Sequence, residues 1–125
     1  MRYPRFMTPS VLKRLRALCL ELPEVEERIS HGEPAWFVRG KRLFVVLSDH
    51  HHDDRVAFWC AAPPSAQEAL VANHPDRYFR PPYVGHRGWL GVYLDVPADW
   101  DEIREHVRDA YRTVAPKALA ASVVG

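Results

Sequence analysis

The sequence predicts an α+β domain in which an antiparallel sheet of five to six strands is packed by three helices. Short strand patterns separated by turn residues fill the middle of the chain, and helical patterns lie near both ends. At 125 residues and 47% hydrophobic, the chain can bury one core without disulfides. No repeat or linker divides it. We therefore expect one domain over residues 1–125, with its core at about residues 9–117.

The first helix is predicted over residues 9–21, because Pro9 suits a first turn and apolar residues then recur at helical spacing. Pro23 ends it. Two further helices are predicted where a capping residue stands three positions before a glutamate, a spacing typical of a capping box. Ser65 opens the shorter of these, and Asp99 opens the last helix, which ends near Val114.

The centre of the sheet is predicted at His31–Leu47, HGEPAWFVRGKRLFVVL. Its two apolar strands, Ala35–Val38 and Lys41–Leu47, are joined at Arg39-Gly40, where glycine permits the positive φ of a tight reversal. The second strand is apolar on both faces, which is typical of a strand covered on both sides.

Other strand patterns precede and follow this hairpin. Residues 25–31 alternate in polarity, VAFWCA at 56–61 is apolar, and YFR at 78–80 is a short candidate. In the last strand, residues 88–94, Gly91 lies between Trp89 and Tyr93, which indicates a close approach by a neighbouring group.

Residues 48–55, SDHHHDDR, are expected to form a loop whose three adjacent histidines raise the possibility of a metal site. Adjacent histidines are poorly preorganised as ligands, and their ordering would cost entropy. We interpret His50, His51 and His52 as adventitious surface ligands and expect no metal site and no cofactor.

Cys19 and Cys60 do not form a CxxC pair, and we interpret them as small core hydrophobes kept as thiols. No apolar run reaches the length of a membrane span, and the first residues lack the apolar core of a secretory signal. A cytoplasmic protein without a membrane partner is expected.

Four segments together resemble the MmcQ/YjbR family of small bacterial proteins: LPEVEE, the hairpin HGEPAWFVRGKRLFVVL, PPYVGHRGWLGVYLD and DWDEIREHVRDAYRTVAPK. They occur in the family's order, and the resemblance runs from about Leu12 to Lys117. It implies a two-layer α+β fold similar to that of frataxin (CyaY), sometimes called a double wing. It also implies an association with DNA binding, but it supplies no catalytic or binding residues.

The first functional hypothesis is a non-enzymatic, DNA-binding protein that uses basic projections from strands and loops. The net charge is only +1, but residues 34–48 and 77–94 contain no Asp or Glu. The candidate phosphate-binding residues in these stretches are Arg39, Lys41, Arg42, Arg77, Arg80 and Arg87. They matter for binding only if the two groups share one surface, and the simpler interpretation is a hydrated rim around packed aromatic residues.

The alternative hypothesis is a module that binds a small anionic molecule or a protein in an aromatic pocket. The candidate pocket residues are Trp36, Trp59, Tyr83, His86 and Trp89. Lys41 and Arg87 would suit an anion. The chain is expected to be a monomer or a weak homodimer.

An enzyme is the third hypothesis, and no catalytic constellation is recognisable. An enzyme would require that His31 or His86 lies in the aromatic pocket, beside a carboxylate or Cys60.

Overall fold

The computed structural model describes residues 7–50 and 54–123. Along the chain the elements are α1 (Met7–Leu20), β1 (Val25–Ser30), β2 (Glu33–Val38), β3 (Arg42–Asp49), β4 (Val56–Cys60), α2 (Ala66–Asn73), β5 (Tyr78–Phe79), the 3-10 turn η1 (Gly85–Arg87), β6 (Leu90–Tyr93), α3 (Trp100–Val114) and α4 (Lys117–Ser122). Within this part of the chain, no helix has both the length and the apolar character needed to cross a bilayer.

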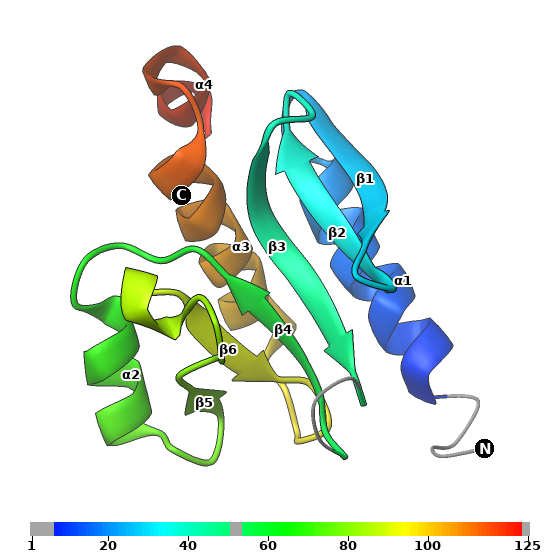
Figure 1. The fold of residues 1–125 in the computed structure, drawn as a ribbon, viewed down its shortest axis with the longest axis vertical. Helices are drawn as coiled ribbons and strands as arrows, with labels where there is room; N and C mark the ends of the chain where they lie inside the picture. Colours follow the sequence, from blue (N-terminus) through cyan, green and yellow to red (C-terminus); the bar gives the residue numbers. More distant parts are fainter. Residues whose placement is uncertain (1–6, 51–53, 124–125) are drawn as a thin grey trace.

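The six strands form one sheet in the order β1-β2-β3-β4-β6-β5, and every neighbouring pair is antiparallel. The predicted α+β fold with an antiparallel sheet is confirmed. β3 and β4 occupy the centre (Figure 1). The hairpin predicted as the centre therefore supplies one central strand, β3, and its other strand, β2, lies next to the edge strand β1. β3 also extends to Asp49, so part of the segment predicted as a loop continues the sheet.

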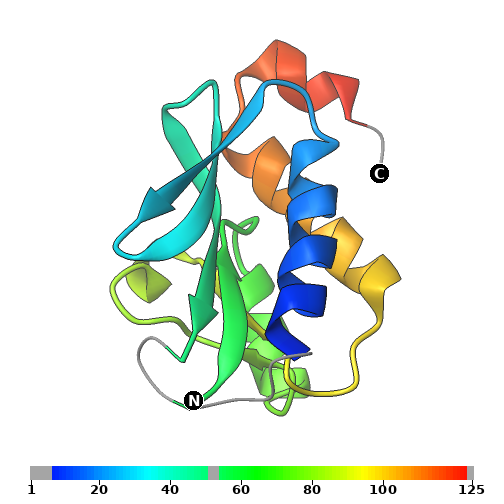
Figure 2. The ribbon, with the colours of Figure 1, turned by 90° about the vertical axis from the view of Figure 1, so that its right-hand side faces the viewer.

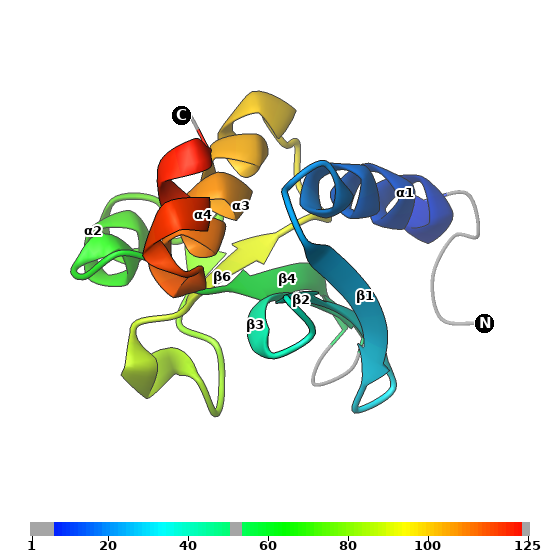
Figure 3. The same cartoon turned by 90° about the horizontal axis from the view of Figure 1, so that it is seen from above.

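Helices α1 and α3 cover one face of the sheet (Figures 2 and 3). The core lies between these helices and the strands. Phe44 and Tyr111 meet there edge to face, with ring centroids 5.7 Å apart, and neither is exposed. Such a pair contributes about 1 kcal/mol beyond its burial. The hydroxyl of Tyr111 also donates to the carbonyl of Pro23 at 2.7 Å, which ties α3 to the segment between α1 and β1.

The last long helix begins as the sequence predicts. The Asp99 carboxylate accepts from the backbone N–H of Asp101 and Glu102, so it satisfies two donors at the start of α3. The buried stripe includes Ile103 and Val107. The fourth helix, α4, was not predicted, and it lies at the end of the predicted core and beyond it.

The predicted capping box at α2 does not form. Ser65 is the N-cap residue, but its φ is +73° and its side chain makes no capping hydrogen bond. The helix nevertheless begins at Ala66, directly after Ser65, where the motif places its start. A buried glutamine, Gln67, instead anchors the first turn.

No helix formed by residues 7–50 or 54–123 crosses the centre of the other face of the sheet (Figure 3). In Figure 3, α1 and α3 lie above the sheet, whereas the yellow-green segment around η1 and the turn between β1 and β2 project below it. These two projections flank the exposed side of β3 and β4. The concave space between them contains the largest pocket described below.

Candidate ligand-binding pocket

The strand register decides which side chains point away from the helices. Ala35 is opposite Val46, Val46 is opposite Trp59, and Trp59 is opposite Gly91. Residues directly opposite in a sheet point to the same face. This row crosses four strands, and two of its members, Val46 and Trp59, form an apolar floor on the open face.

Trp36, a candidate pocket residue, lies on the opposite face. It is opposite Val45 and is completely buried in the helix-side core. Its indole nitrogen donates to Glu27 Oε1 at 3.0 Å, and Arg16 of α1 makes a bidentate ion pair with the same carboxylate. The Arg16 hydrogen bonds lower the pKa of Glu27. Trp36 is therefore a core residue that is fixed from the helix layer.

The open face holds a concave pocket of about 540 Å³. Its size falls within the range of small-molecule sites. The lining comes from the β1–β2 turn, from β3 and β4, and from the segment around η1: Ser30, His31, Glu33, Leu43, Val46, Leu47, Ser48, Trp59, Tyr83, Val84 and Trp89. We call this site the open-face pocket. It brings together three of the five aromatic pocket candidates, Trp59, Tyr83 and Trp89.

The wall made by Tyr83, Val84 and Trp89 is held from behind by Gln67. The Gln67 side-chain amide donates to the carbonyl of Gly85 at 2.8 Å and to that of Trp89 at 2.6 Å. Tyr83 has a φ of +67° and is 74% exposed, so its ring stands at the rim. Trp89 is only 5% exposed and forms the inner part of this wall.

Polar groups gather at the opposite wall. Glu33 is half-buried, and its Oε2 accepts from the backbone N–H of Asp49 at 2.9 Å. Ser30 Oγ lies 3.2 Å from His31 Nδ1, and Ser48 is 7% exposed. An apolar cleft with a few convergent polar groups is typical of a site that orients a ligand.

His86 and Cys60 do not line this pocket. His86 is exposed on η1. Cys60 is buried, and burial raises the pKa of its thiol far above the usual range, so it is a poor nucleophile. His31 and Glu33 both line the pocket, the arrangement that an enzyme would require, but their hydrogen bonds go to Ser30 and Asp49.

Two of the six basic candidates pair with acids that are distant in sequence, and a third bonds a backbone carbonyl. Arg39 pairs with Glu24 at 2.8 Å, and Arg77 pairs with Glu102. Arg42 donates to the carbonyl of Val114 at 3.1 Å. The local absence of Asp and Glu therefore does not make these side chains free cations.

The two basic groups lie on different halves of the sheet. The Arg39–Arg42 reversal joins β2 to β3, whereas Arg77 and Arg80 flank β5, and β4 and β6 lie between (Figure 1). At ordinary strand spacing, β3 and β5 are about 14 Å apart. Arg87 contacts one residue of the pocket lining, with its guanidinium 5.7 Å from the centroid of the Trp89 ring.

The histidine run is only partly within the described residues, since His51 and His52 lie outside them. His50 Nδ1 lies 2.6 Å from Asp49 Oδ1. Among the described residues, no group of three or more His, Cys, Asp or Glu is arranged to hold a metal ion.

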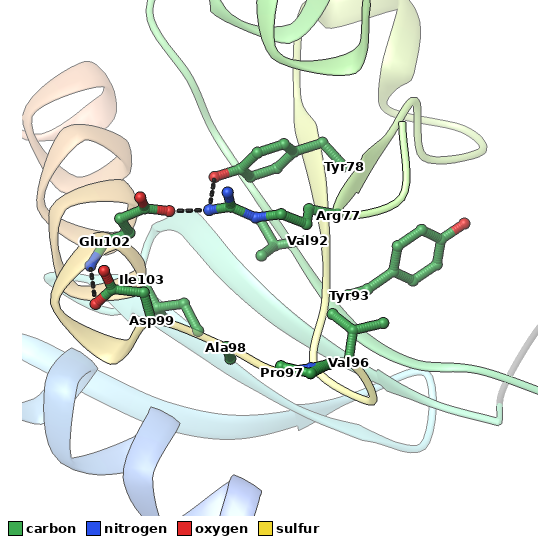
Figure 4. Close-up of a pocket in the computed structure, with 10 residues that line it drawn as sticks. All are labelled: Arg77, Tyr78, Val92, Tyr93, Val96, Pro97, Ala98, Asp99, Glu102 and Ile103. Atoms are coloured by element: carbon green, nitrogen blue, oxygen red, sulfur yellow. Dashed lines mark hydrogen bonds and ion pairs between the residues drawn. The ribbon is translucent and has the colours of Figure 1, made fainter. Parts of the chain in front are cut away.

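Two smaller pockets lie beside α3. The first holds about 20 Å³, enough for a single water, and Figure 4 shows Arg77 reaching between Tyr78 and Glu102 above it. The second, of about 220 Å³, is lined partly by His74 and His106. The Tyr78 hydroxyl lies 2.8 Å from His106 Nε2, and burial lowers the pKa of His106. The side chains here mainly bond one another.

Comparison with family models shows a match to YjbR over residues 20–113. The chain belongs to the YjbR family. The predicted membership is confirmed, and the match covers the sheet and most of α3. A search of curated proteins gives no match.

A solved structure has the same fold as this YjbR-family chain. It is the crystal structure of the Deinococcus radiodurans protein DR2400, with family-model domain DUF419. The TM-score is 0.72 at 20% sequence identity, and the match covers 89% of this chain and 86% of that chain. At this identity the likeness supports the fold and nothing finer.

Sequence reasoning missed the polar wall of this YjbR-family pocket. Glu33 and Ser48 lie two positions from Ala35 and Val46, so strand alternation could have placed them on the same face. Strand alternation could not predict that Val84 lines the pocket, because the path of the segment before β6 depends on the hydrogen bonds from Gln67.

Proposed function

We propose that this YjbR-family protein is a binding module for a small, largely apolar molecule in the open-face pocket. The observation that carries the proposal is a 540 Å³ pocket whose aromatic wall, apolar floor and polar wall come from three separate parts of the chain. Burying one planar ring against Trp59 and Trp89 would supply the main driving force. Ser30, Ser48 and Glu33 would set the ligand's orientation.

The test uses Nile red, a neutral planar dye that fluoresces more strongly in apolar surroundings. We expect saturable binding of one dye per chain. Val46→Trp places a large side chain in the pocket and should weaken binding at least about tenfold. The matched control is Ile29→Trp, since Ile29 is 70% exposed and lies outside the lining. Absence of dye binding, or equal binding by both variants, would contradict the proposal.

DNA binding is the second candidate function. The observation that favours it is that Lys41, Arg80 and Arg87 are exposed and make no ion pair with the residues that the structure describes. The exposed Tyr83 ring stands on the same segment as two of these cations and could stack on an unpaired base.

Single-stranded and double-stranded DNA titrated over a salt series distinguish this candidate. Three free cations predict a slope of log affinity against log salt of about −3 for the duplex, whereas all six candidates would give about −5. Replacing Lys41, Arg80 and Arg87 with Ala should abolish binding. Arg39→Ala is the matched control, because Glu24 already neutralises Arg39. No binding at low salt rejects the candidate.

A further inference from the structure

The polar wall of the open-face pocket carries negative charge. Glu33 is half-buried there, and the backbone N–H of Asp49 holds one of its oxygens in place at 2.9 Å. The Asp49 carboxylate lies 2.6 Å from His50 Nδ1 and does not line the pocket, so Glu33 is the carboxylate of the described lining. Among the described lining residues there is no Lys or Arg. Lys41 and Arg87, which would suit an anion, lie outside the lining.

The facing wall and the floor are aromatic. Trp59, Tyr83 and Trp89 present three electron-rich rings to the same space as Glu33. Ring faces attract cations, and this attraction strengthens where water is excluded. The Trp89 ring already attracts one cation, since the Arg87 guanidinium lies 5.7 Å from its centroid, outside the pocket lining.

We propose that the open-face pocket selects an organic ammonium ion with a flat or branched apolar body. This inference rests on the proposed function and names its ligand class. The ammonium group would lie between the Glu33 carboxylate and the aromatic rings, and the apolar body would cover Leu43 and Val46. A carboxylate ligand of the same shape would meet Glu33 with like charge and would be rejected.

The experiment compares three probes that share a phenyl ring and a two-carbon arm: 2-phenylethylammonium, neutral 2-phenylethanol and anionic 3-phenylpropionate. Their affinities for the full chain are measured by NMR titration at neutral pH and low salt. We expect the ammonium probe to bind about tenfold more tightly than the alcohol, and the anion to bind most weakly.

Glu33→Gln removes the charge but leaves an amide oxygen to accept the Asp49 N–H. It should reduce the affinity for the ammonium probe to that for the alcohol, without changing the affinity for the alcohol. The matched control is Glu26→Gln on β1, since Glu26 is exposed and outside the lining. It should change neither affinity.

The outcomes separate the two proposals. If the alcohol binds and charge has no effect, or if the anion binds most tightly, the ammonium inference is wrong and the binding function stands. If none of the three probes binds, both are wrong. Because the probe comparison uses the unmodified chain, it decides the inference even if Glu33→Gln fails to fold.

Discussion

The side-chain nitrogen of Gln67 lies 2.6 Å from the carbonyl oxygen of Trp89. Gln67 is 6% exposed, and its second hydrogen bond goes to Gly85 at 2.8 Å. One buried side chain of α2 thus satisfies two backbone acceptors of the segment that forms the aromatic wall. The shape of the open-face pocket therefore depends on a residue that does not line it.

We predict that Gln67→Leu destabilises the protein by about 2 kcal/mol, because it removes the Gln67 hydrogen bond to the Trp89 carbonyl and leaves the Gly85 carbonyl with the Gly88 N–H alone. It should also weaken Nile red binding, since the wall is no longer fixed. Urea unfolding and the dye titration measure the two effects. Glu68→Leu at the exposed neighbouring position is the control. Unchanged stability in Gln67→Leu would contradict this role.

Gly91 has no side chain because the ring of Phe79 occupies that space. A Cβ at Gly91 would lie 2.4 Å from Phe79 Cζ. Gly91→Ala should therefore destabilise the protein by about 1–3 kcal/mol through overpacking. Adding Phe79→Leu should recover part of the lost stability, because the smaller side chain makes room for the new methyl group and the two sites therefore couple. If thermal unfolding shows additive losses in the double variant, the proposed clash is wrong.

The Glu27 carboxylate is the hydrogen-bond acceptor of the buried Trp36 indole. Glu27→Ala should cost about 1–3 kcal/mol, because it leaves that N–H without a partner in the core. Glu27→Gln retains an acceptor and should cost less. Urea unfolding of both variants at neutral pH gives the comparison, and equal losses would show that the ion pair with Arg16 dominates.

His106 predicts a pH dependence of stability. Burial lowers its folded pKa, so the unfolded chain binds the proton more readily. The contribution of neutral His106 to the free energy of unfolding is fully present above the unfolded pKa of about 6.5. It is lost as the pH falls below that value. Tyr78, Arg77, Glu105 and Asp109 also act on this site.

We expect the unfolding free energy of the unmodified chain to decrease between pH 7.5 and pH 5 more steeply than that of His106→Gln. One proton contributes at most about 1.4 kcal/mol per pH unit. Urea unfolding at several pH values measures both slopes. Parallel slopes would mean that the ring is equally accessible to protons in the folded state.

The fold was predictable because its main signals are local. The Arg39-Gly40 reversal, the apolar strand after it and the Asp99 cap all act within a few residues, and the structure contains all three. The close approach at Gly91 was also predicted, because large aromatic residues lie two positions before and after it in the sequence. The group that approaches is the Phe79 ring.

The site was predictable only in part, because it depends on register and on contacts between distant residues. Trp36 and Trp59 have similar sequence surroundings, yet the irregular β2–β3 register and the hydrogen bond to Glu27 place Trp36 on the helix side. Likewise, the acids that neutralise Arg39 and Arg77 lie 15 and 25 positions away in the sequence. No local pattern indicates those pairs.

The most direct test of the open-face pocket follows the indole N–H signals of the four tryptophans while 2-phenylethanol is added. Trp59 and Trp89 line the pocket, whereas Trp36 is buried on the helix side and Trp100 lies on α3 beneath Arg14. The proposed function predicts saturable shifts of the Trp59 and Trp89 signals, with those of Trp36 and Trp100 unchanged. Shifts at Trp36 or Trp100 alone, or no shift at any tryptophan, would contradict it.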